Sequence, residues 1–187
     1  VVKSGGVKTY VDNSVASVQT DVNTFKTPNI VGVSNFTGSL ITHNKNWVDF
    51  PGLEVTITPR LANSSFLING NCILGNERSE ILFAKIVYKV NNSSFQDVIT
   101  ADGLGANRRS VHGLTDMDYD SNNWASAINI HLWGSGLSYN LLDTLTFKVQ
   151  IQGSNNSNHA LYFNRTQNNN DDHYTPRGVS TLTVQEI

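Results

Sequence analysis

The densest group of chemically versatile side chains lies in a stretch without hydrophobic periodicity, residues 101–126. Planar aromatic and guanidinium groups stand there beside carboxylates and amides. That combination suits a sugar, which presents both apolar faces and hydroxyl groups. It suits contacts between subunits equally well, so a receptor contact and a subunit contact both stay open. The candidates are Arg108, Arg109, His112, Asp116, Asp118, Tyr119, Asp120 and Trp124.

Part of this stretch, "DMDYDSNNW" (116–124), begins like a calcium loop because Asp116, Asp118 and Asp120 alternate. A calcium loop also needs Gly at its sixth position and a carboxylate at its twelfth, which here is Ala127. The five histidines show no spacing typical of a zinc site. The sequence therefore favours a solvated acidic loop, and we predict no metal site and no other cofactor.

Catalytic groups are equally hard to assemble. "GSGLS" (134–138) is not the Gly-x-Ser-x-Gly elbow of a hydrolase, and Cys72, the single cysteine, has the apolar parity of a buried small hydrophobe. Glycoside cleavage needs two facing carboxylates, and nothing singles out a pair among Glu54, Asp97 and Glu186. We therefore predict that the chain is not an enzyme.

Composition excludes further classes. The net charge is −2 and charged residues make up 15% of 187 residues, so nothing favours nucleic acid or an anionic membrane surface. No run approaches the roughly 18 apolar residues of a membrane span. Because the first residue is Val, we expect the chain to be processed or, preferably, cut from a longer polypeptide.

The elements that position these residues are predicted to be strands. After Pro28 the apolar residues alternate with polar ones, which is typical of strands with one buried face. Turn residues separate the strands, and no helical pattern follows residue 25. We expect a β-sandwich head over residues 28–187, an antiparallel jelly roll ahead of an immunoglobulin-like arrangement, because one cysteine cannot form the immunoglobulin disulfide. The clearest alternation covers 53–58, 66–74, 82–90, 128–132, 145–152, 161–163 and 182–184.

The N-terminal segment follows a different period. Its apolar residues have the 4-3-4-3 spacing of a heptad seam, although Val, Ser, Asn, Thr and Asp favour a helix poorly. Thr9 is a candidate N-cap. Two hypotheses stay open, a helix lying on the sandwich or a short trimeric coiled coil over residues 1–27, since β-branched core residues favour more than two strands. We favour the trimer, whose stem residues are Val11, Val15, Val18, Val22 and Phe25.

Each end of the chain carries a distinctive motif. "GVKTYVDNSVASV" (6–18) resembles the "ATKxYVDxxVA" joint in tail-fibre proteins of tailed bacteriophages, with Val7 in place of the usual Thr. The C-terminal stretch 161–187 resembles the ending of marine phage virion proteins, a "Y-x-N-R" strand, a polar loop and a closing strand. The matching residues are Tyr162, Asn164, Arg165, Arg177, Ser180, Thr181, Leu182, Thr183, Val184, Glu186 and Ile187.

This resemblance implies a homotrimeric tail fibre or fibre tip in the virion, which contacts other virion proteins through an upstream or N-terminal segment. Its head would be similar in outline to the tumour-necrosis-factor (TNF) and C1q heads, and it would contact a host-surface glycan or protein. A capsid-bound decoration protein or head fibre is the alternative, and a carbohydrate depolymerase is the less favoured third hypothesis. Membrane insertion is not expected.

Overall fold

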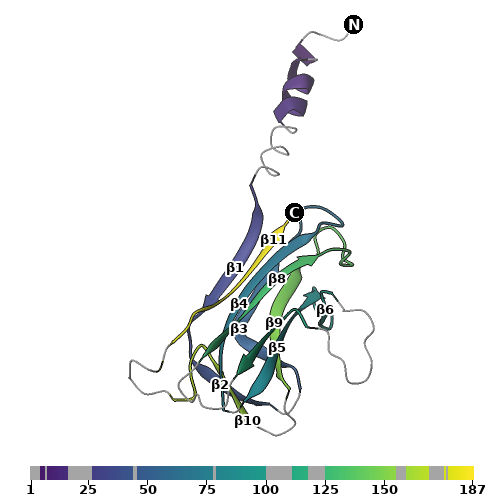
Figure 1. Cartoon of the computed structure of the whole chain (residues 1–187). Coiled ribbons are helices and arrows are strands. Elements are labelled where there is room, and N and C mark those ends of the chain that lie inside the picture. The colour runs from purple at the N-terminus through teal and green to yellow at the C-terminus, as the bar shows by residue number, and fades with distance from the viewer. Residues whose placement is uncertain are drawn as a thin grey trace.

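The computed structural model describes residues 5–6, 8–16, 27–43, 46–77, 79–99, 111–117, 125–154, 159–168, 175 and 177–187. Within them the protein is mainly β, with two antiparallel sheets facing each other and one short N-terminal helix (Figure 1). No helix among them is long and apolar enough to cross a membrane.

Sheet A has six strands and sheet B has five. Sheet A consists of β1 (Asn29–Asn35), β2 (Ser39–His43), β4 (Phe66–Asn76), β8 (Ser126–Gly134), β10 (His159–Phe163) and β11 (Ser180–Glu186). Sheet B consists of β3 (Val48–Ile57), β5 (Glu80–Val90), β6 (Gln96–Asp97), β7 (Gly113–Met117) and β9 (Leu145–Gly153).

Strand β4 organises sheet A. One of its edges pairs with β8, while the other pairs first with β11 and then with β10. β1 lies beyond β11 and β2 lies beyond β10. In sheet B the order is β3, β9, β5, and the far edge of β5 pairs with β7 and β6. Strands adjacent in sequence therefore often lie in opposite sheets.

The core fills the space between the sheets with the side chains that the alternation assigned to the buried face. Phe66 contacts Phe147 across the sheets with ring centroids 5.6 Å apart, and Phe50 meets Phe163 at 4.7 Å. Cys72 is fully buried, and burial raises the pKa of its thiol to about 12, so its prediction as a small hydrophobe is confirmed. All seven segments with clear alternation are strands.

Four short strands were not predicted, namely β1, β2, β6 and β7. In β1 the inward residues are only half-buried, and outward Ile30 and Gly32 do not contrast with inward Val31. The stretch 101–126 is not wholly aperiodic, since β7 lies within it and β8 begins at its end. These strands lie at or near sheet edges and are short or only half-buried on their inward side, so their alternation is weak.

The N-terminal helix includes residues 5–6 and 8–16, so the prediction of Thr9 as an N-cap is wrong. Thr9 lies inside the helix and its hydroxyl donates to the Gly5 carbonyl at 3.0 Å. Ser14 donates to the Tyr10 carbonyl in the same way at 2.9 Å. Small hydroxyl residues thus bond to the preceding turn instead of capping it.

Candidate functional site

The described part of the N-terminal helix carries apolar side chains that are exposed to solvent. Val11 is 49% exposed and Val15 is 61% exposed. They lie four residues apart and so share one side of the helix. The helix stands clear of the β body (Figure 1), and every residue from 8 to 16 is exposed. The other predicted stem residues, Val18, Val22 and Phe25, lie outside the described residues.

Most candidates in the stretch 101–126 also lie outside the described residues. These are Arg108, Arg109, Asp118, Tyr119, Asp120 and Trp124. The structure brings His112 against strand β5, where its Nδ1 accepts a hydrogen bond from the Ile86 amide at 2.8 Å. Its Nε2 lies 3.0 Å from the Ile99 carbonyl. Burial is the main reason why the pKa of His112 is lowered, so this side chain supports the fold.

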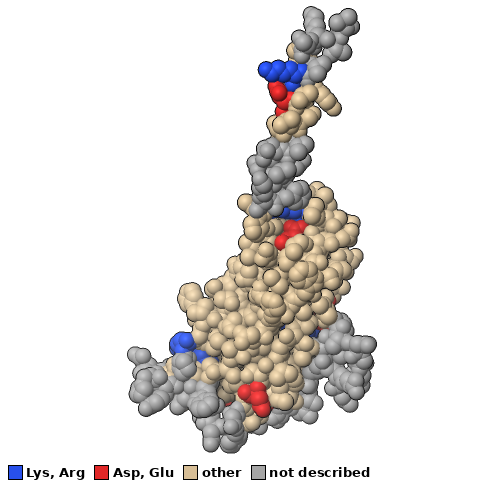
Figure 2. Space-filling model, turned by 45° about the horizontal axis from the view of Figure 1, so that its top comes forward, with Lys and Arg blue, Asp and Glu red and all other residues tan. Residues whose placement is uncertain are grey.

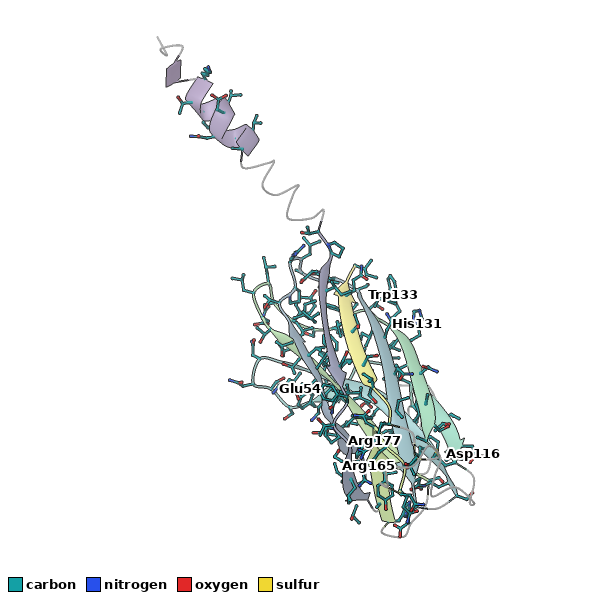
Figure 3. All side chains as sticks on the ribbon, turned by 90° about the vertical axis from the view of Figure 1, so that its left-hand side faces the viewer. Glu54, Asp116, His131, Trp133, Arg165 and Arg177 are labelled. Carbon is teal, nitrogen blue, oxygen red and sulfur yellow. The ribbon has the colours of Figure 1, made fainter. Side chains whose placement is uncertain are left out.

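Asp116 is the exposed candidate. It lies on β7 opposite Ile81 of β5. Figure 3 shows it on the lower part of the body, well away from Trp133 at the other end of β8. Among the residues that the structure describes, no group of three His, Cys, Asp or Glu side chains is placed to hold a metal ion.

Residues of the C-terminal sequence motif form a buried polar junction between strands of sheet A. Asn164 is fully buried in the left-handed backbone region at φ 58°. The backbone amide of Asn164 donates to the Ile73 carbonyl at 2.9 Å, and its backbone carbonyl accepts from the Gly178 amide at 3.0 Å. The Ser180 hydroxyl donates to Asn164 Oδ1 at 2.5 Å and accepts from the Ile73 amide at 2.8 Å. This junction joins β4, β10 and β11.

The two arginines of the motif lie beside this junction. Arg165 and Arg177 form an antiparallel bridge, and both side chains crowd the backbone at Gly38. The Arg165 guanidinium lies 4.7 Å from the centre of the Tyr162 ring. A Cβ at Gly38 would lie 2.4 Å from an Arg177 nitrogen, so a larger residue there would require the arginine side chains to shift. Tyr162, Asn164, Arg165, Arg177 and Ser180 are thus assembled as structural residues.

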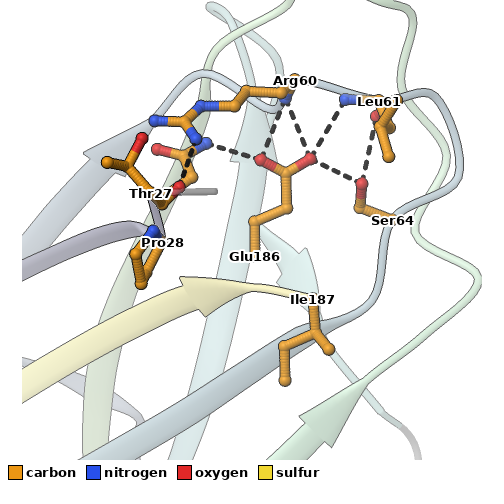
Figure 4. A pocket seen from close by; sticks show the side chains of 8 residues that line it. Thr27, Pro28, Arg60, Leu61, Ser64, Glu186 and Ile187 are labelled. Atoms are coloured by element: carbon orange, nitrogen blue, oxygen red, sulfur yellow. Dashed lines mark hydrogen bonds between the residues drawn. The ribbon is translucent and has the colours of Figure 1, made fainter. Parts of the chain in front are cut away.

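Glu186 forms a second polar cluster where the chain enters the β body (Figure 4). Its carboxylate accepts hydrogen bonds from Asn29 Nδ2 at 2.6 Å and the Ser64 hydroxyl at 2.6 Å. The Arg60 amide donates to both its oxygens at 2.9 and 3.0 Å, and the Leu61 amide donates at 3.1 Å. Partial burial raises the pKa of Glu186, but these hydrogen bonds outweigh it and the net shift is downward.

The Glu186 cluster lines a cavity of about 190 Å³ with Thr27, Pro28 and Ile187. Arg60 Nη1 donates to the Thr27 carbonyl at 2.5 Å, which fastens the residues just before β1. Tyr139 holds the same loop, since its hydroxyl accepts from the Ser64 amide at 2.7 Å and donates to the Leu61 carbonyl at 2.9 Å. The cluster is a clasp at the base of the N-terminal segment. The sequence marked Glu186 as part of a motif and gave no signal of its partners.

The other two carboxylates considered for catalysis lie on sheet B. Asp97 pairs with Lys85 at 2.7 Å, and Glu54 is exposed on β3. Glu186 lies at the end of β11 in sheet A, with neutral donors around it. The structure therefore does not bring these three carboxylates into one constellation.

The chain matches no protein family profile, and no curated protein is significantly similar to it. Among solved structures it is similar to that of the infectious bursal disease virus Gx strain, with 13% identity, a TM-score of 0.43, and coverage of 86% of this chain and 38% of that one. T=1 particles derived from infectious bursal virus are 12% identical with a TM-score of 0.43, and the match covers 85% of this chain and 36% of that one. The VP2 subviral particle of infectious bursal disease virus is 9% identical with a TM-score of 0.38, and the match covers 86% of this chain and 42% of that one. The chain spans about two fifths of the length of these chains.

Proposed function

We propose that this chain is a virion structural protein in which three copies join through the N-terminal helix and carry a β head that contacts the host surface. The observation that carries the proposal is the exposed pair Val11 and Val15 on a helix whose described residues 8–16 are all exposed. A short helix of poor helix formers is marginal alone, so burial against other copies gives it a reason to form. β-branched residues at both seam positions favour three strands over two.

The head in this proposal is a jelly roll similar in outline to the TNF and C1q heads. The support is the strand order, in which β1–β11–β4–β8 faces β3–β9–β5–β7 and successive strands repeatedly change sheets. Such double Greek-key sandwiches occur in viral capsid and lectin domains. The tail-fibre placement follows from the two sequence motifs, and a capsid-bound decoration protein remains the alternative. Gold-labelled antibody on intact particles distinguishes tail from capsid.

The stem part is tested by mass in solution with Val15→Asp and Asn13→Asp. Position 13 lies on the opposite side of the helix from Val11 and Val15, so both variants gain the same carboxylate and only one places it in the seam. We expect trimers for the wild type and Asn13→Asp, and monomers or a much weaker trimer for Val15→Asp. A monomeric wild type contradicts the proposal.

The host-contact part rests on the stretch 101–126, of which Asp116 is the exposed described candidate. In this proposal the chain binds and does not react. Incubation with host polysaccharide should leave the polymer length unchanged while the protein is retained on the polymer or the cell surface. Shortening of the polysaccharide would favour the depolymerase hypothesis instead.

A further inference from the structure

The outward surface of four adjacent strands of sheet A contains no Asp, Glu, Lys or Arg. We call it the sheet A face. Figure 2 shows a broad surface without charged side chains, with charges gathered toward its ends. Its residues are Ala127, Asn129, His131 and Trp133 on β8, Leu67, Asn69, Asn71 and Ile73 on β4, Thr181, Thr183 and Gln185 on β11, and Ile30, Gly32 and Ser34 on β1.

The strand register arranges these residues in rows across the sheet. The row nearest the start of β1 is Ile30, Gln185, Leu67 and Trp133. Ile30 is 52% exposed and Trp133 is 51% exposed, so this row leaves two large apolar side chains in solvent. Figure 3 shows Trp133 and His131 projecting from β8 on the side of the body opposite Glu54.

Polar groups on the middle rows are held in place by one another. Asn71 Nδ2 donates to Asn129 Oδ1 at 2.7 Å. His131 Nδ1 is hydrogen-bonded to Asn69 Oδ1 across the same two strands. Side chains fixed in this way lose less conformational entropy when a partner covers them. The sheet A face is therefore both uncharged and partly preorganised.

We infer that the sheet A face packs against a second copy of this chain, so that the β heads contact one another next to the stem. The inference rests on the proposed function, because a parallel stem holds the copies in one register and brings the apolar row of each to the same height. β1 is the first strand after the stem and belongs to this face, so the stem leads directly onto it. Buried centres of interfaces are depleted of charge and enriched in Trp.

The size of the sheet A face sets how much it can contribute. Three strand spacings of about 4.8 Å and six residue steps of about 3.4 Å give roughly 14 by 20 Å, or about 300 Å². A standard interface buries about 800 Å² on each partner. The face is therefore an addition to the stem contact, and disrupting it should weaken the trimer without abolishing it.

The test compares Thr183→Lys, at the centre of the sheet A face, with Thr56→Lys on the outward side of β3 in sheet B. Both positions are outward and solvent-accessible, so a flexible Lys is accommodated in a single β body. In the full-length chain, sedimentation over a concentration series should show a trimer dissociation constant raised at least about tenfold for Thr183→Lys, because a charge is buried without a partner. Thr56→Lys should leave it within about twofold.

A second variant guards against misfolding. Trp133→Ala removes a half-exposed ring and should weaken the trimer with an unchanged unfolding temperature of the β body. If Thr183→Lys and Trp133→Ala both keep the wild-type dissociation constant, the inference is wrong while the stem proposal stands. If the wild type is monomeric, both the inference on the sheet A face and the stem proposal are wrong. Loss of polysaccharide binding with an intact trimer would show that a glycan, and not a second copy, occupies the face.

Discussion

The outward faces of the two sheets obey the same alternation and differ in chemistry. Sheet A presents Asn, Thr, Gln and apolar residues, whereas sheet B presents three lysines and their partners. Lys148 pairs with Asp49 at 2.6 Å and also lies 3.8 Å from the centre of the Phe95 ring. Lys89 lies 5.0 Å from the same ring.

The lysine side chains of sheet B contact aromatic rings as well as pairing with carboxylates. Lys85 pairs with Asp97 at 2.7 Å and lies 4.7 Å from the Trp47 ring, and only 14% of its side chain is exposed. Lys and aromatic side chains together cover the sheet and leave charged tips at the surface. Sheet B therefore pairs its lysines within one chain, although Leu114 of β7 and Ile81 of β5 are also exposed on it.

The contrast teaches that the low charge of the chain is not spread evenly. The net charge of −2 does not predict this uneven distribution, since the same total would result if both sheets carried charged residues equally. Sheet B carries the paired charges that an exposed sheet needs, and the sheet A face carries none. The folding pattern does not require this difference, so we attribute it to what each face contacts.

The largest effect on the free energy of unfolding is expected at the buried polar junction around Asn164 in sheet A. Asn164→Ala removes the acceptor of Ser180 and the donor to the Thr37 carbonyl, 3.2 Å away, in a buried site. Two lost buried hydrogen bonds and a positive φ, which Ala tolerates poorly, should lower the free energy of unfolding by about 3 kcal/mol. Denaturant unfolding measures it.

Asn91→Ala is the matched control on sheet B. Asn91 also has a positive φ, 50°, and hydrogen-bonds to Asp143 and Thr144, but it is exposed. Water can replace those partners, so its loss should cost about 1 kcal/mol. Equal losses for the two variants would mean that the buried junction does not specially support sheet A.

The sequence predicted the strands with strong alternation, because burial on one side of a strand gives an apolar period of two residues. The outward position of His131 and Trp133 was implicit in the inward parity of Ile128, Ile130 and Leu132, so the sheet A face was partly readable before the structure. The junction at Asn164 was not, since its partners come from β4, from β11 and from the segments before β2 and before β11, and only the fold brings them together. The clasp at Glu186 depends on the loop at 60–64 in the same way.

A smaller effect is expected from Glu186→Gln at the stem end of sheet A. The variant amide presents NH₂ where one oxygen accepted hydrogen bonds, so donors from Asn29, Arg60 or Ser64 lose an acceptor. We expect about 2 kcal/mol less unfolding free energy at pH 7. Glu54→Gln on sheet B, an exposed position, should change it by less than about 0.5 kcal/mol.

The contribution of Glu186 also depends on pH. Its pKa in the folded chain lies below the reference value of 4.5, so folding favours the ionised form. The stabilisation is complete above about pH 4.5 and is lost as the pH falls through the folded pKa. Unfolding curves of the wild type and Glu186→Gln should therefore converge as the pH is lowered. A difference that widens in acid would mean that the carboxylate is not held as described.

The smallest effect is expected from Asp49→Asn on sheet B. The Asp49 side chain is 55% exposed, so its ion pair with Lys148 contributes less than about 1 kcal/mol. Because solvent ions screen an exposed pair, raising the salt concentration should remove most of the difference between Asp49→Asn and the wild type. The cost of Glu186→Gln should persist in salt, since the groups that donate to its carboxylate are uncharged amides and a hydroxyl. Urea unfolding of both variants at low and high salt measures this. If the cost of Asp49→Asn persists in salt while that of Glu186→Gln vanishes, the distinction between a self-paired sheet B surface and a neutral sheet A is wrong.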